Sequence, residues 1–284
     1  MINKTIAITG HSGIIGSNFL KKFKQNKYIK CNFDITDRKK VFKWIKNIDF
    51  DIFIHFAAIV PITEVNKNKK LSYAVNFTGT KNIVDAIVKF KKKKIWFFYS
   101  STSHVYGFKK KIELINEKCK PKPHNYYGKT KVLSEKYIQK KMKKNQIFCI
   151  GRIFSFTDQR QDSSFFVPRM FKEVLNKKKK IISLKNPNSQ RDFIAVKDVI
   201  MAINLLNKKN SKGIFNIASG KSVSLKSILS KIIKISKFKK KIKMIETNEV
   251  QHLIADTSKL NKHLNWHAKS NILMILRSYL KKIN

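Results

Sequence analysis

The chain has 284 residues, of which 42% are hydrophobic and 11% aromatic, enough to bury a sizeable core and too many for a disordered chain. Its net charge is +45, with 62 basic residues against 17 acidic ones. Only six basic residues are arginines, and base readout and phosphate clamping favour the arginine fork. The composition therefore argues against specific nucleic-acid binding and indicates a solvated lysine surface that attracts anionic ligands.

The sequence also bears on the compartment. No signal peptide is recognisable after Met1, and apolar runs such as Ile95 to Tyr99 are far shorter than the ~20 residues that cross a bilayer. The three cysteines, Cys31, Cys119 and Cys149, are an odd number without C-x-x-C spacing, which is typical of reduced thiols. We expect a cytoplasmic protein with no membrane span.

Apolar periodicity predicts strands that alternate with helices up to residue 153. Strands are predicted at 4–9, 28–33, 51–56, 95–100 and 146–153, and helices at 14–24, 38–47, 76–90 and 127–143. Later helices are predicted at 167–175, 198–206, 225–235 and 272–282. Short strands alternating with helices indicate a parallel sheet built from βαβ units. No internal repeat or clear linker divides the chain.

A glycine-rich turn follows the first predicted strand. In Gly10-His11-Ser12-Gly13-Ile14-Ile15-Gly16, the first glycine allows a tight turn, Gly13 lets the backbone approach a pyrophosphate, and Gly16 lets helix and strand pack closely. The start of the following helix offers N–H groups and a positive dipole end to phosphates. This context predicts a dinucleotide site.

The spacing G-x-x-G-x-x-G resembles the fingerprint of the extended short-chain dehydrogenase/reductase family. Three further segments resemble its landmarks in chain order: Asp34 to Asp37 its adenine-contacting turn, His55 to Ala58 its alanine-rich strand end, and Asn76 to Asn82 its N-x-x-G-T-x-N helix start. The resemblance implies NAD or NADP as cofactor. The cofactor-binding residues that it implies are Gly10, Ser12, Gly13, Ile14, Ile15, Gly16, Asp34, Ile35, Phe56, Ala57, Ala58, Asn76, Tyr127 and Lys131.

The same resemblance assigns the catalytic residues. Y-x-x-x-K spacing alone means little in a lysine-rich chain, and Tyr106 and Tyr137 also have it. Tyr127 and Lys131, however, open a long predicted helix and share one of its faces. Upstream, Ser100 to Gly107 resembles the family segment S-S-x-x-x-V-Y-G and places the catalytic hydroxyl on Thr102, 25 residues before Tyr127, as in UDP-galactose 4-epimerases.

Tyrosine, lysine and threonine suit hydride-transfer chemistry. A free tyrosine has a pKa of about 10, and a nearby ammonium together with the positive nicotinamide ring would favour the phenolate. Tyr127 is then expected to exchange a proton with a sugar hydroxyl or carbonyl, while Lys131 holds the nicotinamide ribose and Thr102 orients the reacting oxygen.

The second half of the chain indicates the substrate class. Gln190 to Val199 resembles the R-D-F-x-x-V-x-D-V segment, in which the arginine meets a sugar-nucleotide phosphate. An ion pair of Arg191 with an acidic neighbour is the alternative. Segments 215–220, 255–259 and 264–266 resemble later landmarks, so the resemblance runs from Lys4 to about Trp266. The expected substrate-binding residues are Thr102, Ser103, Ser155 and Arg191.

The fold that this resemblance implies is α/β: a Rossmann-type doubly wound parallel sheet with a smaller, interleaved C-terminal substrate region. We expect an NAD(P)-binding domain over 1–155, to which 190–220 returns, and a substrate-binding region over 156–284. The resemblance also suggests a homodimer formed through the helix that begins at Tyr127 and its neighbour. His263 and His267 have i, i+4 spacing but no third ligand nearby, so no metal site is expected.

Departures from the family pattern reduce the number of candidate reactions. The 4,6-dehydratases carry Thr-Asp-Glu where this chain has Thr102-Ser103-His104, so dehydration lacks its acid pair. The short segment from Lys30 to Phe33 resembles dTDP-4-dehydrorhamnose reductases and removes the acidic residue expected to bind the 2′-hydroxyl of NAD. Lys30, or other lysines nearby, could instead accept the 2′-phosphate of NADP.

The preferred interpretation is therefore reduction of a 4-keto(-6-deoxy) sugar nucleotide, in oligosaccharide or polysaccharide synthesis. Two alternatives stay open. The first is an NAD-dependent 4-epimerase, because Arg152 to Phe156 stands where epimerases have an R-x-F-N segment. The second is a family fold recruited for RNA binding or scaffolding, which has no need for Tyr127 and Lys131 at this spacing.

Overall fold

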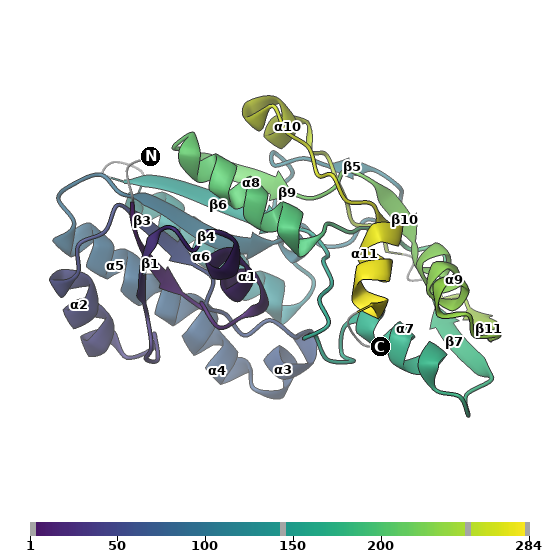
Figure 1. Cartoon of the computed structure of the whole chain (residues 1–284). Helices are drawn as coiled ribbons and strands as arrows, with labels where there is room; N and C mark the ends of the chain where they lie inside the picture. The colour runs from purple at the N-terminus through teal and green to yellow at the C-terminus, as the bar shows by residue number, and fades with distance from the viewer. Residues whose placement is uncertain (1–3, 143–145, 248–250, 282–284) are drawn as a thin grey trace. The chain divides into compact units, whose positions relative to one another are not determined.

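The computed structural model describes residues 4–142, 146–247 and 251–281 (Figure 1). Contacts within the chain divide it into two compact units. The first comprises Met1–Gly107, Lys120–Ile153 and Ile200–Phe215, and the second Phe108–Cys119, Phe154–Val199 and Asn216–Asn284. The chain passes from one unit to the other more than once, so each unit is assembled from segments that are distant in sequence.

A six-stranded sheet organises the described part of the first unit. Its strands are β1 (Thr5–Thr9), β2 (Lys27–Lys30), β3 (Ile52–His55), β4 (Trp96–Thr102), β6 (Ile147–Ile153) and β9 (Gly213–Ile217). Their order is β2-β1-β3-β4-β6-β9, and the pairings of β1 with β2 and β3, of β3 with β4 and of β4 with β6 are parallel. The register aligns Thr9 with His55 and Thr102 with Ile153.

Both faces of this sheet are covered, which explains why its strands are apolar without alternation. Ala7, Phe53 and Phe97 lie in one core with three helices, α2 (Arg38–Asn47), α5 (Thr80–Phe90) and α6 (Tyr126–Met142). Successive side chains of a strand point to opposite faces of the sheet, so the neighbouring positions of these strands face the other side. There the ring of Phe98 lies 6.0 Å from that of Phe56, which in turn contacts Phe19 of α1 (Ile14–Lys22). The predicted doubly wound Rossmann-type sheet is confirmed.

The strand order reverses at β1. The chain leaves β1 for the edge strand β2 and returns through α2 to β3 on the other side of β1. In open α/β sheets, ligands bind outside the carboxyl ends of the strands at such a switch point. The residues that follow β1 and β3, Gly10 and Phe56 to Ala58, therefore meet at the position where a ligand site is expected.

The helical segment before α5 differs from the sequence prediction. A single helix was expected over 76–90, but Ala74–Gly79 forms a π-helical segment (η1) after α3 (Ile62–Lys67) and α4 (Lys69–Tyr73), and α5 begins only at Thr80. π-Helical turns recur at functional sites. A short 3₁₀ turn, η2 (Ser103–Val105), follows β4, and α8 (Val196–Lys208) leads towards β9.

The second unit packs helices against pairs of short strands. Its helices are α7 (Phe166–Leu175), α9 (Leu225–Ser236), α10 (Ser258–Leu264) and α11 (Ile272–Leu280). Its strands are β5 (Leu114–Ile115), β7 (Ile181–Lys185), β8 (Gln190–Asp192), β10 (Ser222–Ser224), β11 (Lys241–Ile245) and β12 (Ile254–Ala255). The pairs are β7 with β11, β8 with β10 and β5 with β12.

The core of this unit joins α7, α9 and α11 to β7, and Figure 1 shows α7 and α9 beside β7 and β11. The rings of Phe171 and Tyr279 stack with centroids 4.6 Å apart, and Ile182 and Leu184 are the buried residues of β7. In the described part of the chain, no helix is long and apolar enough to cross a membrane.

Candidate active site

The glycine turn after β1 is shaped by close contacts within the protein. Gly10 has a φ of +67°, and a Cβ built on it would lie 2.4 Å from the backbone nitrogen of Ala57. A Cβ on Gly16 would lie 2.3 Å from the carbonyl oxygen of Gly10. These two positions therefore require glycine for the turn and for close packing of α1 against it.

Gly13 is less tightly enclosed by the protein than Gly10 and Gly16. A Cβ at this position would meet only the Gly10 oxygen, at 3.3 Å. Gly13 is the N-cap of α1 and, like Ser12, is exposed, and no acidic residue lies in the first helical turn. An open backbone at a helix start without negative charge fits the pyrophosphate of a dinucleotide.

A second turn follows the edge strand β2. The carboxylate of Asp34 accepts a hydrogen bond from the Thr36 N–H at 2.8 Å, while Ile35 is buried. A Cβ on Gly79 would lie 2.6 Å from the side chain of Ile35, and Asn82 donates to the Ile35 carbonyl at 3.1 Å. The turn is thus held against η1 and α5 with the Asp34 side chain exposed.

A buried neutral histidine fixes the loop after β3. His55 Nδ1 lies 2.6 Å from Thr9 Oγ1, and its Nε2 lies 2.9 Å from Thr80 Oγ1. The Thr9 hydroxyl also accepts the Ala57 N–H at 3.4 Å. Burial, assisted by the positive charge of Lys131, lowers the pKa of His55 to about 3. The histidine therefore positions Phe56 to Ala58 without adding charge.

Asn76 connects the same loop to α6. Its side chain accepts the Ile59 N–H at 2.8 Å and donates to the Ile59 carbonyl at 3.0 Å and to Thr130 Oγ1 at 3.3 Å. The Thr130 hydroxyl donates in turn to the carbonyl of Tyr127 at 2.7 Å. Because both ends of the Asn76 amide are bonded within the protein, this residue acts on the site by holding the loop.

Thr102, Tyr127 and Lys131 come together at the carboxyl end of β4. Their exposures are 6%, 7% and 2%, and the Tyr127 hydroxyl is hydrogen-bonded to the Thr102 side chain. The Lys131 Nζ lies 5.9 Å from the centroid of the Tyr127 ring and donates to the Ser100 carbonyl at 2.8 Å. The structure therefore brings all three predicted catalytic side chains into one buried cluster.

Burial controls the charges in this cluster. It raises the pKa of Tyr127 above the ordinary value of 10, and the hydrogen bond with Thr102 offsets only part of that rise. Burial also lowers the pKa of Lys131 to about 7, while the carboxylate of Glu135 works in the opposite direction. At neutral pH Tyr127 is a protonated phenol, able to donate a proton to a developing alkoxide.

Arg191 and Ser155 belong to the second unit. The Arg191 guanidinium lies 4.5 Å from the centroid of the Phe108 ring and donates to the carbonyls of Gln190, at 3.1 Å, and Gln251. Burial lowers the pKa of Arg191 to about 10. Among the residues that the structure describes, no carboxylate forms an ion pair with Arg191. The Ser155 carbonyl accepts the Ile194 N–H at 2.9 Å, so Ser155 lies beside the segment that follows β8.

Residues 20–279 match the family model described as GDP-mannose 4,6 dehydratase. The GDP-6-deoxy-D-talose 4-dehydrogenase of Aggregatibacter actinomycetemcomitans is 30% identical over 267 residues, which cover 90% of this chain and 89% of the relative. The chain belongs to this family. The family predicted from the sequence and the prediction of an enzyme are confirmed.

One more distant relative and two solved structures extend the comparison. The GDP-6-deoxy-D-mannose reductase of Pseudomonas aeruginosa is 22% identical over 241 residues, covering 81% of this chain and 79% of the relative. RMD from Pseudomonas aeruginosa, complexed with NADPH, has a TM-score of 0.86 at 19% identity and covers 98% of each chain. The UDP-glucose 4-epimerase of Thermus thermophilus, in complex with NAD, has a TM-score of 0.84 at 18% identity, over 98% of this chain and 99% of that one.

The two residues after Thr102 lie close to the catalytic cluster. Ser103 is buried, and His104 Nδ1 lies 3.0 Å from the side-chain nitrogen of Asn125. The ring of His104 lies 6.0 Å from that of Tyr127. Thr102 is thus followed by a buried serine and by an imidazole close to the Tyr127 ring.

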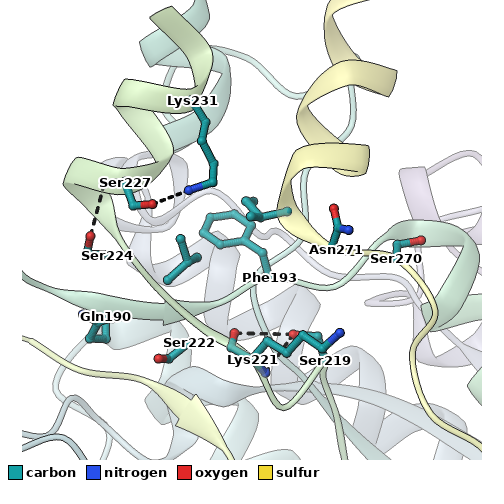
Figure 2. Close-up of a pocket in the computed structure, with 12 residues that line it drawn as sticks. Gln190, Phe193, Ser219, Lys221, Ser222, Ser224, Ser227, Lys231, Ser270 and Asn271 are labelled. Atoms are coloured by element: carbon teal, nitrogen blue, oxygen red, sulfur yellow. Dashed lines mark hydrogen bonds between the residues drawn. The ribbon is translucent and has the colours of Figure 1, made fainter. Parts of the chain in front are cut away.

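The second unit contains a cavity of about 400 Å³ (Figure 2). It is lined by parts of β8, β10, α9 and α11, and none of its described lining residues is a predicted site residue. The first N–H groups of α9 are already bonded, those of Leu225 and Lys226 to backbone carbonyls and that of Ser227 to Ser224. Lys231 donates to Ser227 at 2.5 Å, so this helix start offers little to an anion.

One buried residue close to the catalytic cluster, Glu135, was not singled out by the sequence motifs. Glu135 is buried on α6, one turn beyond Lys131. Its carboxylate accepts a hydrogen bond from the Ser101 hydroxyl and forms an ion pair with Arg152. The only feature of the sequence that pointed to Glu135 is its i, i+4, i+8 spacing with Tyr127 and Lys131, which places all three on one face of the helix.

Within the described residues, no group of three or more His, Cys, Asp or Glu side chains could hold a metal ion.

Proposed function

We propose that this protein reduces the keto group of a nucleotide-linked 4-keto(-6-deoxy) sugar. Membership of the family establishes the broad class, a nicotinamide-dependent oxidoreductase or epimerase of sugar nucleotides. The observation that carries the finer proposal is the Tyr127 phenol, kept protonated by burial and hydrogen-bonded to Thr102 at the carboxyl end of β4. A protonated acid is the state that a reductase needs before hydride transfer.

The proton chemistry follows from the cluster. In the reductive direction the Tyr127 hydroxyl donates its proton to the substrate carbonyl oxygen, and Thr102 orients that oxygen. Lys131 stands one turn from Tyr127 and, when protonated, stabilises the phenolate that remains. Solvent then returns the proton to Tyr127. Ser103, next to Thr102, is proposed to contact the same sugar.

The cofactor site is proposed on residues that meet at the switch point. Ser12, Gly13, Ile14 and Ile15 would hold the pyrophosphate in the turn that Gly10 and Gly16 shape, with Asp34 and Ile35 beside the adenosine half. Phe56, Ala57 and Ala58 would line the ribose, and Asn76 would hold their loop. The nicotinamide, when bound, supplies or accepts the hydride. Lys30 is exposed at the end of β2, where it would favour the 2′-phosphate of NADP.

The nucleotide end of the substrate is proposed to meet Arg191, with Ser155 nearby in the same unit. In the described structure the charge of Arg191 is compensated by carbonyl oxygens and an aromatic face alone. A guanidinium in this state gains two charge-assisted hydrogen bonds when a phosphate approaches it. The relatives named for GDP-linked 6-deoxy sugars support such a substrate.

The 4-epimerase remains the second candidate, because a UDP-glucose 4-epimerase shares the fold. Epimerisation uses the same triad but returns the hydride to the other face of the sugar, so no net oxidation of the cofactor occurs. It requires Tyr127 to begin as a base. Because the positive ring of bound oxidised nicotinamide would favour the phenolate, the same tyrosine serves either reaction, and the fate of the cofactor distinguishes them.

We further propose a cytoplasmic homodimer that serves polysaccharide synthesis. Leu133 on α6 and Leu71 and Tyr73 on α4 are exposed apolar side chains, with exposures of 40%, 48% and 38%. An apolar surface on these two helices supports an interface between copies of the chain. Light scattering should give twice the mass of the chain, and Leu133→Glu should give the monomer.

The decisive experiment mixes the protein with NADPH or NADH and with each of a panel of nucleotide-linked 4-keto-6-deoxy sugars. The absorbance of the reduced nicotinamide is followed over time. We expect stoichiometric oxidation, and Tyr127→Phe should lower kcat at least about 100-fold, the contribution of a general acid. Tyr126→Phe is the matched control, since it removes the neighbouring hydroxyl of the same helix. Retained nicotinamide together with a UDP-sugar inverted at C4 would identify the epimerase instead.

A further inference from the structure

Helix α6 contacts the end of β4 through three residues spaced four apart. Tyr127 bonds to Thr102, Lys131 donates to the Ser100 carbonyl at 2.8 Å, and Glu135 accepts from the Ser101 hydroxyl at 2.5 Å. Each residue of the strand end 100–102 is therefore held by a different turn of the same helix. The first two contacts belong to the triad, and the third has no part in the proton chemistry described above.

Glu135 is itself held by an arginine from the next strand. Arg152 lies on β6 directly opposite Ser101 in the parallel register. Its Nε lies 3.1 Å from Glu135 Oε1 and its Nη2 lies 2.7 Å from Oε2, a two-point pairing. The side chains of Arg152 and Glu135 are 3% and 2% exposed. The guanidinium also lies 4.6 Å from the centroid of the ring of Tyr106, which follows η2.

A gain in stability does not explain the buried pair of Glu135 and Arg152. Two charges buried together gain little over apolar side chains of the same volume, because desolvation offsets their attraction. What the pair does provide is geometry: a planar fork and a carboxylate tie β4, β6 and α6 together within one residue of Thr102. A shift of about 1 Å in a catalytic group can cost 100-fold in rate.

We propose that Glu135, held by Arg152, is a positioning residue that sets the Thr102 hydroxyl against Tyr127 and the Lys131 ammonium. This inference rests on the proposed function of the triad. Glu135 also supplies negative charge one turn from Lys131, which opposes the effect of burial on that ammonium. The other titratable groups around Lys131 are Tyr99, at 4.7 Å from ring centroid to Nζ, Tyr127 and neutral His55.

The sharpest test replaces both charges at nearly constant volume. Glu135→Gln alone removes the carboxylate that compensates the buried Arg152 charge and can unfold the protein. The double variant Glu135→Gln/Arg152→Met removes that penalty, and a thermal melt identifies it as folded. We expect its kcat to fall about ten- to 100-fold with KM little changed, because the triad is displaced while the contacts proposed for the nucleotide end, at Arg191 and Ser155, stay.

The pH profile of kcat/KM distinguishes loss of the positioning role of Glu135 from a general loosening of the structure. Lys131 must be protonated to stabilise the phenolate, so activity is lost as the pH rises through its pKa. Without the Glu135 charge that pKa falls, and the basic limb of kcat/KM moves to lower pH. A merely loosened structure would lower the whole profile without moving its limb. Glu173→Gln, which breaks an exposed ion pair with Lys179, is the charge-removal control.

A readout without turnover keeps this inference separate from the proposed function. Crystal structures of the wild type and the folded double variant should show the Thr102 to Tyr127 hydrogen bond intact in the first and lost in the second. A double variant with that bond retained and with wild-type kcat and pH limb would overturn the inference. If the wild type turns over no substrate at all, the proposed function fails while the crystal structures still decide the role of Glu135.

Discussion

At the scale of single residues, the glycine turn combines positions with different demands. Gly10 and Gly16 are required by contacts with the protein itself, since a Cβ on either would come within 2.4 Å of a backbone atom. Gly13 has more room on the protein side, with its nearest contact at 3.3 Å. The three glycines of one fingerprint therefore predict different results for the same substitution.

We expect Gly16→Ala to lower the free energy of unfolding by about 1–3 kcal/mol, the cost of overpacking against backbone that cannot easily move. Gly13→Ala should leave stability within about 1 kcal/mol and weaken NADPH binding about ten-fold, because the methyl group occupies ligand space. Chemical denaturation and a nicotinamide fluorescence titration measure the two effects. Equal losses of stability in both variants would contradict this division of roles.

His55 predicts a pH dependence of stability. Its pKa is lowered to about 3 in the folded protein, while an unfolded histidine titrates near 6.5, so the unfolded chain binds the proton more tightly. Stability from this group is present above pH 6.5 and is lost as the pH falls, by about 1.4 kcal/mol per unit. Between pH 7 and pH 5 the wild type should lose about 2 kcal/mol more than His55→Gln, measured by urea unfolding. Parallel curves for the two proteins would refute the assignment.

At the scale of elements, the sequence predicted best where patterns are long. The helix expected over 38–47 coincides with α2, and the strand expected over 146–153 with β6 to within one residue. The π-helical start of the helix expected from 76 was not predicted, because apolar spacing does not register an added residue in one turn. Strands of two or three residues such as β5 and β8 are too short to show a period.

Asn76 predicts the cost of uncoupling two elements. Replacing it with alanine leaves the N–H and carbonyl of Ile59 without their partner and frees the loop after β3 from α6. We expect Asn76→Ala to lower the free energy of unfolding by about 1–3 kcal/mol and to weaken nicotinamide binding. Asn68→Ala, which removes an exposed cap of α4, is the matched control and should cost about 1 kcal/mol with unchanged binding. Similar binding losses in both variants would argue against the loop-holding role.

At the scale of the whole molecule, sequence motifs predicted the site residues but not the contacts between segments that are distant in sequence. Thr102, Tyr127 and Lys131 were assigned from two short segments, and the structure brings them together. The pairing of Glu135 with Arg152 was not predicted, because it depends on the register that sets Ser101 opposite Arg152. Residues 108–119 belong with the second unit because β5 pairs with β12, a contact across about 140 residues that no local pattern indicates.

The net charge of +45 predicts how the whole chain responds to salt. With 62 basic and 17 acidic residues, repulsion within the folded protein destabilises the compact state. The screening length falls from about 30 Å at 0.01 M to about 10 Å at 0.1 M ionic strength, so added NaCl should raise Tm by several degrees over that range. Thermal melts in NaCl and in NaF at equal ionic strength should agree, since screening depends on ionic strength alone. If phosphate raises Tm and saturates at low concentration while NaCl has no effect, the stabilisation comes from an anion bound at one site, and repulsion across the surface is not what limits the stability of this fold.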